Sequence, residues 1–158
     1  MALIGPADQQ RLRDAFAAMT RPVHLLFFTQ TLDCDLCPET RQILDELPPL
    51  SDQISVEEVN LILERERAQA FGIDRAPAVA VTYANGTAPG SAPPEGGGLH
   101  WTDSRIRFVG APAGYEFISL VQAVLIAGGR PLSLSEESRR LIAAVDRPVT
   151  LQVFTTPT

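Results

Sequence analysis

The chain has 158 residues, enough for one ordinary domain with its own hydrophobic core. Apolar residues make up 45% of it and charged residues 20%, a balance typical of globular rather than disordered proteins. The formal net charge is −6 and basic side chains form no stripe, so we expect neither nucleic acid nor an anionic membrane as the main partner.

The pattern of apolar residues predicts helices and strands in alternation. Apolar residues at helical spacing predict helices over 7–19, 41–47, 62–73 and 111–129. Continuous or alternating apolar runs predict strands over 22–29, 53–59, 78–84 and 104–110, with a loop rich in glycine, proline and alanine at 85–101. This order contains a β-α-β unit followed by a helix, a β-hairpin and a packing helix. We therefore expect an α/β thioredoxin fold over 1–130, a mixed four-stranded central sheet with flanking helices.

The segment beyond Gly129 repeats the beginning of the chain. The run RPVHLLFFTQT at 21–31 matches RPVTLQVFTTP at 147–157, an offset of 126 (147 − 21), and each copy follows a short amphipathic helix that carries arginine. We expect residues 131–158 to begin a second thioredoxin-fold unit with a helix and a strand. A strand at 148–155 would have unpaired edges, so it would seek a partner chain, and self-association through this strand is one outcome.

The sequence contains neither a recognisable targeting signal nor a membrane span. The opening stretch MALIGPADQQRLRDAF carries charges where a signal peptide needs an apolar run. The most apolar stretch, 118–126, is interrupted by Gln122 and is far too short to cross a bilayer. We therefore expect a cytoplasmic protein, in which a pair of cysteines is more often catalytic or metal-binding than a permanent bridge.

The only two cysteines, Cys34 and Cys37, form a CxxC pair in the stretch TLDCDLCPET. A structural zinc site needs four N or S donors, and the chain adds only His24, in an apolar strand, and His100, in a loop, so we expect no metal site. Two buried core cysteines are the plain structural alternative. A redox couple fits the context best, because Cys34 follows a buried strand and stands at the N-terminus of the helix that carries Cys37.

The position of the pair suggests a division of roles. Unpaired N–H groups and the positive end of the helix dipole stabilise a thiolate at Cys34, which would make it the nucleophile. Cys37, one turn further along, could then attack the mixed disulfide and release the product. This exchange needs no organic cofactor.

Pro77, in the stretch DRAPAV, directly precedes the strand predicted over 78–84. We expect that strand to lie beside the strand over 22–29, which leads to the cysteines. A cis Ala76–Pro77 bond would turn residue 76 toward Cys34 and offer its N–H and C=O to an extended substrate. A trans proline that merely begins an edge strand is the alternative. Given the fold, we expect the cis form.

Four stretches together resemble the protein disulfide oxidoreductases of thermophilic archaea and bacteria: ALIGPADQQRLRDAF, RPVHLLFFTQTLDCDLC, IDRAPAVAVTYANG and RFVGAPAGYEF. These glutaredoxin-related proteins have two thioredoxin-fold units in one chain, each with a CxxC pair. The resemblance implies that Cys34 is the nucleophile, Cys37 the resolving thiol and Pro77 the cis proline, and that a thioredoxin-reductase-like flavoenzyme supplies electrons. In the family a second CxxC would follow Thr158, so we expect a fragment of a longer parent; a natural single-unit protein is the alternative.

Three carboxylates surround the pair: Asp33, Asp35 and Glu39. Negative charge close to a thiolate raises its pKa and opposes the helix dipole. We therefore expect a reduction potential nearer the thioredoxin value of about −270 mV than the oxidising end near about −120 mV. If all three side chains point into water, screening would leave the pKa almost unchanged.

The sequence thus predicts a thiol–disulfide oxidoreductase that acts on protein disulfides. The rival hypothesis is a non-catalytic module, for substrate docking or for electron relay in a peroxide-reducing flavoenzyme, in which a second unit carries turnover. Glu57 and Glu58 are candidates for a proton-transfer carboxylate near Cys37, with solvated strand-edge charges the favoured interpretation.

Overall fold

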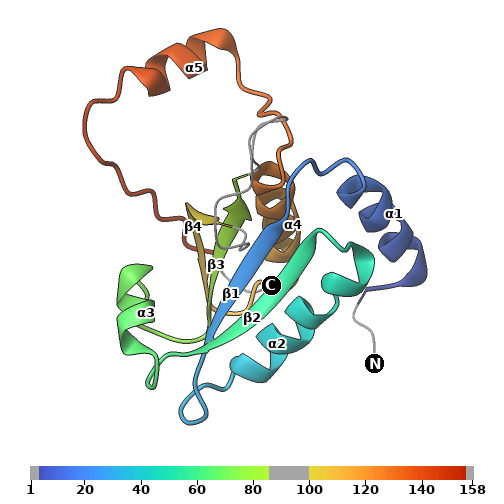
Figure 1. The fold of residues 1–158 in the computed structure, drawn as a ribbon, viewed down its shortest axis with the longest axis vertical. Helices are drawn as coiled ribbons and strands as arrows, with labels where there is room; N and C mark the ends of the chain where they lie inside the picture. The colour runs from blue at the N-terminus through green and yellow to red at the C-terminus, as the bar shows by residue number, and fades with distance from the viewer. Residues whose placement is uncertain (1–3, 86–99, 156–158) are drawn as a thin grey trace.

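The computed structural model describes residues 4–85 and 100–155 (Figure 1). Its helices are α1 (Pro6–Phe16), α2 (Cys37–Asp45), the 3₁₀ helix η1 (Pro48–Leu50), α3 (Arg65–Ala70), α4 (Tyr115–Ala127) and α5 (Glu136–Ala143). Its strands are β1 (Val23–Thr29), β2 (Ile54–Asn60), β3 (Ala78–Ala84) and β4 (Trp101–Val109). Among the described residues, no helix combines the length and the apolar character needed to cross a bilayer.

The four strands form one mixed sheet in the order β2-β1-β3-β4. Strand β1 is parallel to β2, where Val23 pairs with Ile54, and antiparallel to β3, where Phe28 pairs with Ala78. Strands β3 and β4 form an antiparallel hairpin with a register irregularity in the middle. This topology confirms the predicted thioredoxin fold.

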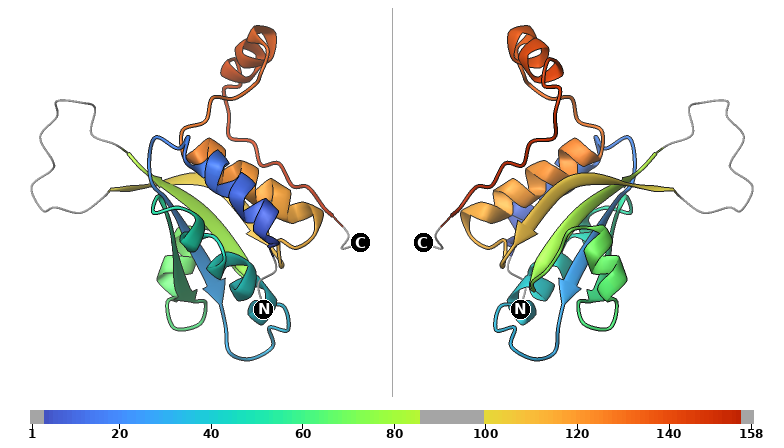
Figure 2. Two further views of the ribbon diagram at one scale, coloured as in Figure 1. Left: turned by 90° about the vertical axis from the view of Figure 1, so that its right-hand side faces the viewer. Right: turned by 90° about the vertical axis from the view of Figure 1, so that its left-hand side faces the viewer.

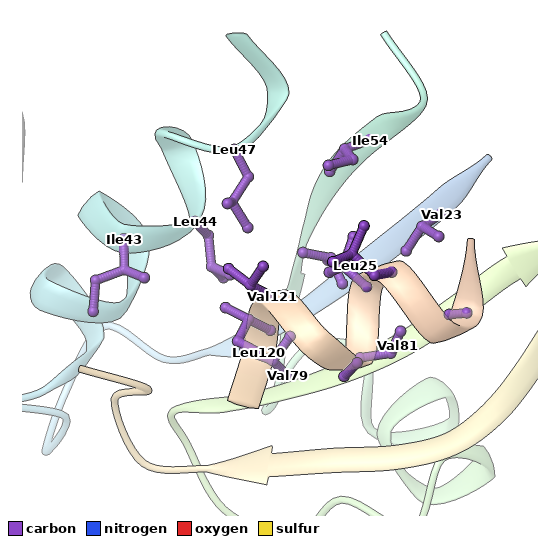
Figure 3. Close-up of a cluster of buried hydrophobic side chains, with 14 of the residues drawn as sticks. Val23, Leu25, Ile43, Leu44, Leu47, Ile54, Val79, Val81, Leu120 and Val121 are labelled. Atoms are coloured by element: carbon purple, nitrogen blue, oxygen red, sulfur yellow. The ribbon is translucent and has the colours of Figure 1, made fainter. Parts of the chain in front are cut away.

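Helices cover both faces of the sheet (Figures 1 and 2). Side chains of β1 alternate between two hydrophobic clusters: Leu25 faces the cluster built with α1, α2 and α4, and Leu26 faces a smaller cluster built with α3. Figure 3 shows the larger cluster, in which side chains from α2 and α4 meet those of the sheet. Burial on both faces explains why the sequence of β1 is a continuous apolar run rather than an alternating one.

Helix α3 is shorter than the predicted 62–73 because its first turn is replaced by a capped loop. The side-chain carbonyl of Asn60 accepts hydrogen bonds from the N–H groups of Ile62 and Leu63, both at 3.0 Å. The carboxylate of Glu64 in turn accepts a hydrogen bond from the N–H of Asn60 at 2.8 Å. Local bonding of this kind competes with helical hydrogen bonds, so the helix begins only at Arg65.

The hairpin differs from the expectation at its second strand. Strand β4 begins at Trp101, earlier than the predicted 104. Of the predicted loop over 85–101, residues 86–99 lie outside the described residues.

The predicted C-terminal helix is present, whereas the predicted strand over 148–155 is wrong. Helix α5 begins after Ser135, whose hydroxyl accepts a hydrogen bond from the N–H of Ser138 at 3.1 Å. Residues 144–155 form no helix or strand, and the apolar side chains of this segment are exposed: Val149, Leu151, Val153 and Phe154. A strand requires a hydrogen-bonded neighbour, and none pairs with this segment among the described residues.

Candidate active site

Cys34 and Cys37 are joined by a disulfide, with their Cα atoms 5.4 Å apart. Cys34 lies in the turn that follows β1, and Cys37 is the first residue of α2. The N–H of Cys37 donates to the carbonyl of Cys34 at 3.2 Å, which holds the turn closed. The pair therefore stands at the helix N-terminus, as the sequence predicted, with Cys34 just outside the helix.

The two cysteines differ in solvent accessibility. Cys37 is only 6% exposed and belongs to the main hydrophobic cluster, whereas Cys34 is half-buried at its edge. Among the described residues no side chain caps the N-terminus of α2, so the positive end of its dipole remains able to stabilise a thiolate there. Asp33, at φ 55°, takes the left-handed conformation that Asp tolerates better than most residues and turns the chain toward α2. This arrangement leaves Cys34 as the more accessible of the two cysteines.

A pocket of about 550 Å³ adjoins the disulfide, and its lining comes from β1, β2, α2 and the adjoining loops: Thr29, Gln30, Thr31, Cys34, Cys37, Pro38, Arg41, Glu58, Asn60 and Glu64. Arg41 and Glu58 form a two-point ion pair across it, with N–O distances of 2.6 and 2.7 Å. Sequence reasoning considered Glu58 but missed Arg41. Its position one helical turn after Cys37 was the available signal, since residues four apart share a helix face.

The Ala76–Pro77 peptide bond is cis, which confirms the predicted isomer. Phe28 of β1 pairs with Ala78, so the register carries Pro77 to the end of β1 from which the cysteine turn departs. Ala76 packs on the same hydrophobic cluster as Cys34, and the carbonyl of Pro77 accepts a hydrogen bond from Gly110 at 2.9 Å. The cis proline and the disulfide are thus at the same end of the sheet.

The three carboxylates near the pair, Asp33, Asp35 and Glu39, are all exposed. Within the part of the chain that the structure describes, none of them forms an ion pair. Their charge is therefore not neutralised by a neighbouring side chain. Their predicted effect on the pKa of Cys34 stays a prediction.

Glu57 lies on the opposite face of the sheet from Glu58, away from the disulfide pocket. Its carboxylate accepts two hydrogen bonds from Arg67 of α3, at 2.6 and 2.8 Å, and lies 3.0 Å from Nε2 of His24. The Arg67 guanidinium, assisted by His24, lowers the pKa of Glu57 to about 2. His24 also contacts the hydroxyl of Ser55 at 2.7 Å and stacks on Trp101. This network ties the strands to α3, and it excludes Glu57 from the disulfide pocket.

Comparisons with known proteins agree with this architecture. No protein-family model matches the chain. A probable thioredoxin from Methanothermobacter thermautotrophicus is 28% identical over 89 residues, which cover 56% of this chain and 80% of the thioredoxin. The NTD_N/C domain of alkylhydroperoxide reductase AhpF from Enterococcus faecalis is 26% identical with a TM-score of 0.73, over 91% of this chain and 62% of that one. A protein disulfide oxidoreductase from Aeropyrum pernix shares the fold, at 17% identity and a TM-score of 0.68, over 89% of this chain and 54% of that one.

One conclusion follows from the sheet topology, the disulfide at the start of α2 and these likenesses. The chain is a thioredoxin-fold protein with a CxxC disulfide at the start of α2, and it is similar in sequence to a thioredoxin. It spans less than two thirds of the AhpF chain that it matches, 62% of its length. Disulfide exchange by this pair, and its partners, are matters for proposal.

Proposed function

We propose that the chain exchanges disulfides with protein substrates through a mixed disulfide on Cys34. The observation that carries this proposal is the bridged pair at the N-terminus of α2, with Cys34 the more accessible member. In the reducing direction the Cys34 thiolate attacks one sulfur of the substrate disulfide. A Cys34–substrate bond forms, the substrate S–S bond breaks, and the departing thiolate takes up a proton.

Cys37 resolves the mixed disulfide. Its thiolate attacks the sulfur of Cys34, the Cys34–Cys37 bond forms, and the second substrate thiol leaves with a proton from solvent. The protein loses two electrons in total and the substrate gains them. No group beyond the two cysteines is consumed, and a thioredoxin-reductase-like flavoenzyme would restore the dithiol.

Ala76 and Pro77 would bind the substrate backbone next to Cys34. The packing of Ala76 and Cys34 on one hydrophobic cluster, at one end of the sheet, supports this role. An extended substrate segment lying there would bond to the backbone of residue 76, as strand-addition ligands do.

The test is trapping of the mixed disulfide. Cys37→Ser, offered a disulfide-bonded protein such as insulin, should accumulate a covalent adduct on Cys34, because the resolving thiol is gone. Cys34→Ser, the matched control, should form almost none, since Cys37 is buried. Adducts of equal yield in both variants would contradict the assignment of Cys34 as the nucleophile. If the unmodified chain and both variants all fail to reduce insulin, the proposed activity is wrong.

The likeness to alkylhydroperoxide reductase AhpF favours a second candidate, electron relay within such a reductase. Under this hypothesis the disulfide would exchange with another domain of the same protein rather than with free substrates. The reduction potential of the pair, measured against dithiothreitol or glutathione, together with insulin turnover, separates the two. A reversible couple with fast insulin reduction supports the first candidate, and a reversible couple that leaves insulin intact supports the relay.

Residues 131–158 would begin a second thioredoxin-fold unit, in a protein of the cytoplasm. The repeat of 21–31 at 147–157 and the presence of α5 support this division of the chain. The exposed apolar side chains of 149–154 would then be buried by that unit, or by self-association with a second copy through 148–155.

A further inference from the structure

The charge around the disulfide is one-sided. Asp33, Asp35 and Glu39 are exposed and form no ion pair among the described residues, and the sequence from Gln30 to Thr40 contains no basic residue. The first arginine after it, Arg41, already has its charge met by Glu58. The rim of the site therefore carries uncompensated negative charge.

A second hollow, of about 390 Å³, is lined by Leu36, which stands between the two cysteines in the sequence, and it has the same acidic character. Glu39 lines it beside Val109, Gly110 and Tyr115. Glu116 also lines this hollow, and its carboxylate accepts a hydrogen bond from the uncharged Thr155. A peptide that extends from Cys34 along this hollow would pass two carboxylates and no cation, since none of the described residues that line it is Lys or Arg.

Apolar side chains are interleaved with the carboxylates. Leu32 is 76% exposed and Leu36 is 46% exposed, and Tyr115 at the second hollow is also exposed. Exposed apolar groups near a reactive centre favour burial against an apolar partner side chain. Charge complementarity across such a surface acts mainly on specificity and on the association rate.

We infer that this site prefers peptide disulfides flanked by basic and apolar residues and discriminates against anionic ones, such as oxidised glutathione. The inference rests on the proposed function, because it names the substrate class of the same disulfide. An Arg beside the substrate cysteine is attracted by three carboxylates that have no ion-pair partner among the described residues, and a Glu in the same position is repelled by them.

The size of the effect follows from electrostatic steering. Surface potentials of one sign change association rates by about 10- to 1,000-fold, and salt removes most of the effect. With three exposed carboxylates, we expect a ratio of about tenfold between cationic and anionic substrates at low ionic strength. The ratio should approach one as ionic strength rises.

The experiment uses three peptides of equal length, each with one cysteine capped by mercaptoethanol through a disulfide and flanked by leucine. They differ only in carrying Arg, Gln or Glu beside the cysteine. The fully reduced chain of 158 residues is mixed with each, and the second-order rate of peptide thiol release is followed by acid quench and chromatography. Dividing each rate by that of the same peptide with uncharged dithiothreitol removes differences in intrinsic reactivity.

The test variant is Asp33→Asn, Asp35→Asn and Glu39→Gln combined. Asn is chosen at 33 because it tolerates the left-handed backbone conformation of that residue. The matched control removes three carboxylates elsewhere: Glu136→Gln and Glu137→Gln on α5, which lies at the opposite end of the molecule from α2 (Figures 1 and 2), and Asp146→Asn in the segment that follows α5. Any change in the reactivity of Cys34 itself affects all three peptides alike and cancels in their ratio.

A cationic-to-anionic ratio near ten that collapses in the test variant, persists in the control variant and falls with salt would support the inference. A ratio near one in the unmodified chain, with steady exchange of the Gln peptide, would overturn the substrate preference and leave the proposed function intact. Failure to exchange even the Gln peptide faster than Cys34→Ser would overturn the proposed function, and the preference with it.

Discussion

Truncation of Leu44 to alanine probes the packing of α2, the helix that carries Cys37, against the rest of the fold. Leu44 is 0% exposed and belongs to the main hydrophobic cluster. Its side chain points from α2 toward Val121 of α4 (Figure 3). Truncation of a buried leucine costs about 2–5 kcal/mol, from lost transfer energy and the cavity left behind. The sheet and α4 lie on two sides of this site, so the cavity left by the truncation can close only a little. We therefore expect the free energy of unfolding to fall by about 3 kcal/mol.

The measurement is urea unfolding of the disulfide-bonded protein, followed by far-UV circular dichroism. The midpoint should fall while the slope m stays unchanged, since the surface exposed on unfolding is nearly the same. Leu63→Ala is the matched control, because Leu63 is 83% exposed and its truncation should change the free energy of unfolding by less than about 0.5 kcal/mol.

A loss below about 1 kcal/mol for Leu44→Ala would refute the packing argument, because so small a cost is typical of exposed sites. So would equal losses for Leu44→Ala and Leu63→Ala. Either result would mean that α2 does not dock on the sheet through this residue.

Two further predictions concern charged groups. Asp35→Asn removes one uncompensated charge beside the cysteine pair, so the pKa of Cys34 should fall. The measurement is a titration of thiolate absorbance in a background of Cys37→Ser, where Cys34 is the one thiol. An unchanged pKa would show that solvent fully screens the carboxylate. Glu57 is ionised at lower pH in the folded protein, with a pKa of about 2, than in the unfolded chain, where it is near 4.5, so its stabilisation is present above about pH 4.5 and lost toward pH 2. Glu57→Gln should therefore destabilise the protein by up to about 1 kcal/mol at neutral pH and flatten the acid limb of its urea midpoint. A midpoint–pH curve parallel to that of the unmodified protein would contradict the Arg67 pairing.

The order of helices and strands could be predicted from the sequence because the burial of an element determines the pattern of apolar residues along it. The run at 22–29 is apolar at nearly every position since β1 is covered on both faces, and Cys34 and Cys37 fall at a strand-to-helix junction that the flanking patterns mark. The cis isomer at Pro77 was expected from the fold, and the structure has it. Boundaries were less accurate, as at α3, where the side chain of Asn60 competes with the helix for backbone N–H groups.

What the sequence by itself determined is therefore the fold class and the place of the redox pair, because both follow from the spacing of residues along the chain. Tertiary structure alone decided which charges meet: Glu57 and Glu58 are neighbours in sequence, yet alternation along β2 sends the first to Arg67 and the second to Arg41 beside the disulfide. Tertiary structure also decided the conformation of 148–155. The sequence of this segment repeats the pattern of β1, but among the described residues no strand pairs with it. Side-chain pattern sets the preference for a strand, but only a hydrogen-bonded neighbour makes one.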